Sequence, residues 1–221
     1  MLALAVVVGG TARLAAAHGG DPLGTITGNV SFADPEPRGI GYEWTIRMHR
    51  RQTAEVVYAV GAKSWNEPSN PEGLKGWTHT SNWIALELEE PALVKITVAR
   101  QQGVVVTSGS TAAAARFALV PALSLYSGWD STTEFEDHTF NNVGNFWSTI
   151  VYIGSASNAK GRSRVSYKAR LAAGRYSIVI GGNPPSLGDP SAYPAGTCDP
   201  VDATCYRYTG IHGYRATIQT R

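Results

Sequence analysis

Short stretches in which apolar and polar residues alternate recur along the chain, and they constrain its fold more than any other feature. Side chains of an extended strand point alternately to its two faces, so this alternation predicts strands with one buried face. The clearest examples are residues 83–89 and 92–100, which Glu90-Pro91 separates as a turn. The other predicted strands are 42–48, 55–60, 119–126, 165–171, 175–180 and 214–218.

Many short strands separated by turns indicate an all-β fold, an antiparallel β-sandwich of jelly-roll type with long loops. The 24 glycines and 12 prolines supply the turns. Helical periodicity is absent outside the apolar N-terminus, although residues 112–117 are compatible with one short helical turn. The chain has 221 residues, 43% of them hydrophobic, and no internal repeat, so residues 18–221 are predicted to form one domain.

The N-terminus has the character of an export signal. Residues 2–8 are apolar and Ala15-Ala16-Ala17 supplies small residues for cleavage, so residues 1–17 are predicted to be a signal peptide. The positively charged start of such a signal is missing, which leaves a first strand as the alternative. Export predicts a secreted, periplasmic or outer-surface location. It also favours a disulfide between Cys198 and Cys205.

Composition and motifs exclude several functional classes. The formal net charge is +2 and no Lys/Arg stripe alternates with aromatic residues, so no nucleic-acid partner is predicted. No run of about 20 apolar residues follows the N-terminus, so no membrane-spanning helix is predicted. The chain lacks Gly-x-Ser-x-Gly and His-Glu-x-x-His. We therefore do not expect an enzyme.

Histidines offer the best candidates for chemistry. Trp77 and His79 lie two residues apart and, on an extended strand, point to the same face. His138 lies in a later polar loop. Imidazole is the commonest metal ligand at neutral pH, and two imidazoles with a further weak donor suit copper. His212 competes with His138 as the second ligand.

The order of several motifs resembles the CorA/MopE-type copper-binding proteins of methane-oxidising bacteria. The likeness starts at Trp77-x-His79, continues through Asp137-His138 and Asn141-Asn142, and reaches Ala173-Gly174-x-Tyr176. It covers roughly residues 40–220.

This resemblance implies a mononuclear copper site made of two histidines and a kynurenine formed by oxidation of a tryptophan. Carried onto this sequence, Trp77 is the oxidised residue, and His79 and His138 are the ligands. The implied role is copper acquisition or sequestration by a secreted or cell-surface protein, with association with the outer membrane as a further possibility.

Three alternatives remain open from the residues alone. The first is calcium bound by oxygen ligands of one acidic loop, namely Asp130, Glu134, Glu136, Asp137, Asn141 and Asn142. The second is a carbohydrate- or protein-binding module whose exposed stacking residues are Trp44, Trp65, Trp129 and Trp147. The third is a copper-dependent oxidative enzyme in which His18 becomes the N-terminus after cleavage.

Overall fold

The computed structural model contains strands joined by turns, and no helix, in the part of the chain that it describes. That part comprises residues 25–29, 31–33, 42–62, 81–108, 111–129, 150–157, 161–183 and 210–221. Within these ranges there is no helix of the length and apolarity needed to cross a membrane.

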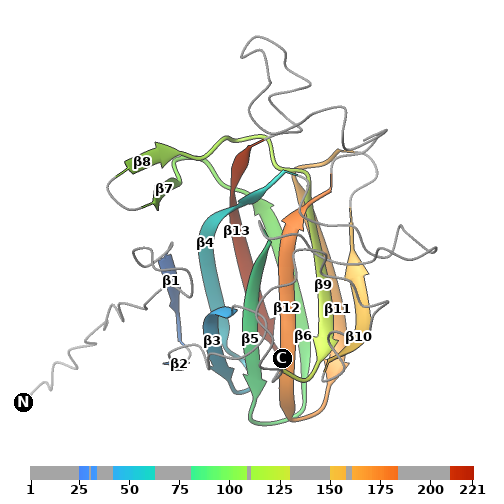
Figure 1. Ribbon diagram of the computed structural model, residues 1–221. Coiled ribbons are helices and arrows are strands. Elements are labelled where there is room, and N and C mark those ends of the chain that lie inside the picture. Colours follow the sequence, from blue (N-terminus) through green and yellow to red (C-terminus); the bar gives the residue numbers. More distant parts are fainter. Residues whose placement is uncertain are drawn as a thin grey trace, which may run out of the picture.

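Two sheets pack face to face, and a small hairpin projects at one end (Figure 1). The five-stranded sheet has the order β1 (Thr25–Gly28), β4 (Thr53–Gly61), β13 (Ile211–Thr220), β6 (Ala92–Arg100) and β11 (Arg164–Leu171). The six-stranded sheet has the order β10 (Val151–Ala156), β9 (Pro121–Ser127), β12 (Gly174–Gly182), β5 (Asn82–Leu88), β3 (Tyr42–Met48) and β2 (Ser31–Ala33). The hairpin consists of β7 (Val105–Ser108) and β8 (Thr111–Ala114).

The predicted all-β sandwich is confirmed, with one parallel pair in an otherwise antiparallel arrangement. β3 and β5 run parallel in the six-stranded sheet. The reason is the path of the chain: β4 follows β3 but belongs to the opposite sheet, so the chain re-enters the first sheet in the direction of β3.

The core between the sheets is built by the alternation seen in the sequence. On β6, Val94, Ile96 and Val98 are fully buried, whereas Lys95 between them faces outward. Burial of each such side chain contributes about 1.5–3 kcal/mol relative to exposure. This term selects the register, because a slip by one residue would place lysine in the core.

Strand pairing defines the two ends of the sandwich. Asn82 pairs with Ile180, and Gly182 pairs with Pro121, so β5 and β9 begin where β12 ends. The same end, uppermost in Figure 1, holds the start of β3. We call it the upper end.

Two expectations from the sequence are wrong. Residues 112–114 belong to strand β8 and form no helical turn, because pairing with β7 outweighs the helix propensity of alanine. Trp44 lies in the core with 3% of its surface exposed, so it is no stacking platform.

Candidate metal centre

The predicted copper donors Trp77, His79 and His138 lie outside the described residues. So do the acidic loop, His18 and the two cysteines. Across the described part of the chain, no three His, Cys, Asp or Glu side chains gather as a metal site would require. The structure does describe the elements that adjoin the donor-bearing segments, and these elements set where the segments begin and end.

A carboxylate fixes the start of β5, three residues after His79. The β3–β5 register shifts between Tyr42 and Trp44, so Glu43 lies in a bulge. Its Oε2 accepts a hydrogen bond from the Trp83 backbone N–H at 2.5 Å, and its Oε1 accepts one from the Asn82 side chain at 3.1 Å. Charge-assisted bonds of this kind are among the stronger ones, so Glu43 holds the chain at its entry into β5.

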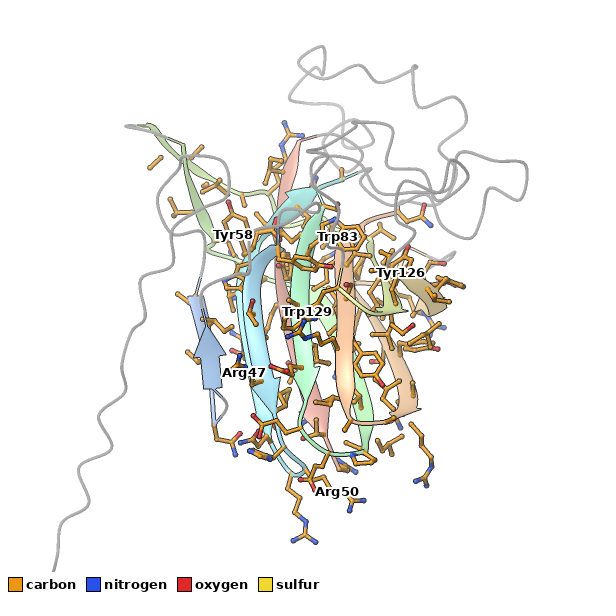
Figure 2. All side chains as sticks on the ribbon, turned by 60° about the horizontal axis from the view of Figure 1, so that its bottom comes forward. Arg47, Arg50, Tyr58, Trp83, Tyr126 and Trp129 are labelled. Atoms are coloured by element: carbon orange, nitrogen blue, oxygen red, sulfur yellow. The ribbon has the colours of Figure 1, made fainter. Side chains whose placement is uncertain are left out.

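The same bulge places Tyr42 on the outward face of the six-stranded sheet, where other aromatic residues gather. Tyr42, Trp83, Tyr126 and Ile150 are buried there in one cluster with the partly buried Trp129, and we call this set the outer aromatic cluster. The rings of Trp83 and Tyr126 lie 5.8 Å apart. Figure 2 shows Trp83 and Tyr126 at the end of the sheet remote from Arg50. Trp129 lies between these two residues and Arg50.

The outer aromatic cluster joins the flanks of both donor-bearing segments. Trp83 lies four residues after His79, whereas Trp129 and Ile150 flank the segment 130–149 that carries His138. The indole N–H of Trp129 donates to the backbone oxygens of Leu86 and Tyr176, at 3.3 and 3.0 Å. Residues that flank two segments far apart in sequence therefore belong to one cluster on one face of one sheet.

The imidazole of His212, the competing ligand, already forms a hydrogen bond within the fold. It is fully buried on β13, and its Nδ1 accepts a hydrogen bond from the Ala118 backbone N–H at 3.1 Å. A neutral imidazole that accepts at Nδ1 carries its proton on Nε2, so neither nitrogen offers a free lone pair to a metal. This arrangement favours a structural role for His212.

His49 lies at the opposite end of the sandwich. Its Nε2 is 2.9 Å from Oε2 of Glu89, and both side chains are exposed. β4 begins four residues after His49 and runs for nine residues, or roughly 27 Å, to the upper end. His49 is thus too remote to share a metal with a donor that adjoins the start of β5.

A group of inward-facing polar residues closes the core at the upper end, and we call Glu43, Tyr58, Asn82 and Tyr214 the polar cap. Tyr58 and Tyr214 are cross-strand partners. Burial, followed by the nearby charge of Glu43, raises the pKa of Tyr58 to about 12. Burial raises the pKa of Tyr214 well above its ordinary value, and the charge of Glu43 adds to this. The buried Tyr214 hydroxyl has no hydrogen-bond partner among the described residues.

The polar cap predicts loss of stability in alkali. Tyrosines of the unfolded chain ionise near pH 10. Tyr58 and Tyr214 keep their protons above that pH in the folded chain, so unfolding releases protons and its free energy falls as the pH rises from 10 to 12. The free energy of unfolding should fall by about 1.4 kcal/mol per pH unit for each tyrosine. Denaturant titrations across this range measure it, and the double variant Tyr58→Phe/Tyr214→Phe should flatten it. An unchanged slope in that variant would assign the effect to other groups.

Glu43 could not be recognised as important from the sequence. It alternates with Tyr42 and Trp44 as a surface residue of a half-buried strand would. Only the bulge turns its carboxylate toward the polar cap and the start of β5.

Comparison with known proteins gives distant structural similarities. Neither a protein-family profile nor a curated protein matches the sequence. The surface-associated copper-binding protein CorA, important in copper acquisition by Methylomicrobium album BG8, aligns at 14% identity and a TM-score of 0.43, over 80% of this chain and all of its own. The secreted protein MopE of Methylococcus capsulatus, in which an oxidised tryptophan facilitates copper binding, aligns at 11% identity and 0.42, over 95% and 98%.

A third similar structure is the pre-peptidase C-terminal domain of a Bacillus anthracis collagenase, at 7% identity and a TM-score of 0.33, over 84% of this chain and all of that domain. Proteins of different function thus appear at similarly low scores. The function of this chain has to be argued from its own residues.

Proposed function

We propose that this protein binds one copper ion through His79 and His138, with Trp77 as a third, oxidised donor. It acts in copper acquisition or sequestration, outside the cytoplasm of a bacterium, and carries out no turnover. The observation that carries the proposal is the Trp77-x-His79 spacing directly before β5, within the ordered set of motifs described above.

The placement of the flanking residues supports this pairing of ligands. Trp129 contacts the backbone of Leu86, which lies four residues, or roughly 13 Å, along β5 from Asn82. His138 follows Trp129 by nine residues, and a chain of that length reaches up to about 30 Å. The segment carrying His138 is therefore long enough to meet one that ends at the start of β5.

The donor chemistry suits copper as cargo. Neutral imidazoles bind both copper oxidation states, and the chain offers few softer donors. Oxidation of Trp77 takes up one dioxygen across the C2–C3 bond of the indole, and hydrolysis then releases the C2 carbon as formate. The product is an aromatic amine two residues from His79, and an aromatic amine is a better donor than an indole.

A single experiment with two readouts tests the proposal. The secreted protein is purified, titrated with copper against a competing chelator, and its Trp77 peptide is weighed by mass spectrometry. We expect one tightly held copper per chain. We also expect the mass of the Trp77 peptide to change by the gain of two oxygen atoms and the loss of one carbon monoxide. The peptide containing Trp44, which is buried, serves as the unmodified control. Absence of tight copper binding would refute the proposal, whereas tight binding with an intact Trp77 would remove only the third donor.

A further inference from the structure

The outward face of the five-stranded sheet gathers positive charge from strands that lie far apart in sequence. Inward positions of β6, β11 and β13 hold core residues such as Ile96, Val165 and Ala216. The alternate positions therefore face outward, and the hydrogen bond between the hydroxyls of Thr97 and Ser166, 2.9 Å long, confirms that they share one face. The charged residues on this face are Lys95, Arg164, Lys168, Arg170, Arg215 and Glu55. We call this set the cationic face.

Five cations thus accompany a single acid, although the whole chain carries a net charge of only +2. Glu55 lies 3.6 Å from the guanidinium of Arg215 and so offsets that residue alone. The four remaining cations have no carboxylate beside them at the outward positions of the described strands.

Two lysines lie directly opposite each other on this face. Lys95 on β6 and Lys168 on β11 are register partners in an antiparallel pair. Like charges at such positions repel and destabilise the sheet. Lysines on an edge strand such as β11 discourage aggregation, but Lys95 lies on an internal strand, between β13 and β11, where no edge needs protection. Edge protection therefore does not explain the pair.

The face fits an extended array of phosphate groups. It spans β11 to β13, about 10 Å, and the seven residues from Arg164 to Arg170, about 20 Å. The outward positions of the described strands in the five-stranded sheet hold no aromatic side chain, so the stacking platforms that bind single-stranded nucleic acids and sugars are missing on this face. An exposed sheet also offers none of the enclosure that a small free anion needs.

We propose that the cationic face docks on an anionic membrane surface by binding the phosphates of its lipid headgroups. Each basic side chain near such a surface strengthens binding about fivefold, and salt weakens the attraction within a Debye length of about 10 Å at 0.1 M. This docking does not depend on copper, so the failure of one proposal leaves the other intact.

Vesicle co-sedimentation of the full chain tests this docking. Vesicles of phosphatidylcholine with phosphatidylglycerol should bind the protein at low salt, whereas phosphatidylcholine alone should not. The variant Lys95→Gln/Lys168→Gln should lose roughly 25-fold in affinity, at about fivefold per cation. The matched control Arg50→Gln/Arg51→Gln changes the net charge equally in the β3–β4 turn and should bind like the original protein.

Three outcomes would overturn the proposal. The first is no binding to the anionic vesicles. The second is an equal loss of vesicle affinity in both variants, because binding would then depend on the net charge of the protein and not on the cationic face. The third is displacement by inorganic phosphate at matched phosphorus concentration and ionic strength, which would make free phosphate the ligand. The lysine variant removes a repulsion and should fold normally, and an unfolding midpoint no lower than that of the original protein verifies this.

Discussion

Replacement of His79 or His138 by alanine is expected to lower the copper affinity by at least about 100-fold. Mutation of residues that merely orient a metal ligand already costs 10–100-fold, and removal of a ligand itself costs more. With one imidazole gone, copper would keep a single histidine and a weak third donor. A chelator-competition titration of each variant measures the loss.

Two other histidines serve as controls for this experiment. His49→Ala removes an exposed imidazole at the opposite end of the sandwich, so copper affinity should stay unchanged. His212→Ala removes the acceptor of the Ala118 N–H in a fully buried position, so it should destabilise the fold without a specific effect on copper. Full copper affinity in both ligand variants would refute the proposed site. A folded His212→Ala protein without copper binding would make His212 the ligand.

Replacement of Trp44 by alanine is expected to destabilise the protein by about 3–5 kcal/mol. Its indole is buried between the sheets, with its ring edge-on to Tyr58 at a centroid distance of 5.9 Å. Truncation leaves a cavity that the two sheets cannot close without shifting their strands. Chemical denaturation monitored by circular dichroism gives the change directly.

The exposed Phe117, 49% accessible, provides a matched aromatic control. Phe117→Ala should change the free energy of unfolding by no more than about 0.5 kcal/mol. An equally small effect of Trp44→Ala would mean that the indole is not a core residue. That result would reopen the interpretation of Trp44 as a stacking platform for sugars.

A second tryptophan proposed for stacking is also engaged within the protein. The guanidinium of Arg175 lies 4.4 Å from the ring centroid of Trp129, and the indole N–H binds two backbone oxygens. Both the ring and its donor thus have partners in the fold. Trp65 and Trp147 lie outside the described residues, so their roles as stacking residues stay predictions.

Strands with one buried face could be predicted from the sequence, and irregular features could not. The bounds 42–48 and 92–100 match β3 and β6, because alternation reports burial on one side. β10 could not be predicted, because Val151 and Tyr152 are exposed and because buried and exposed residues do not alternate along this strand. The bulge at Glu43 has no sequence signal, since it arises from the pairing of β3 with a strand nearly 40 residues away.

The same distinction applies to function. Local spacing, as in Trp77-x-His79, can be recognised in a sequence, and it supplied the copper hypothesis. The cationic face could not be recognised, because Lys95, Lys168 and Arg215 become neighbours only through the strand order β13–β6–β11. A net charge of +2 conceals such a segregation of charge.

The position of β13 governs when this protein can fold. Among the described strands, β13 lies at the centre of the five-stranded sheet and is the only link between the β1–β4 pair and the β6–β11 pair. The sheet therefore cannot close until residues 211–220 are available, however early the other strands are synthesised.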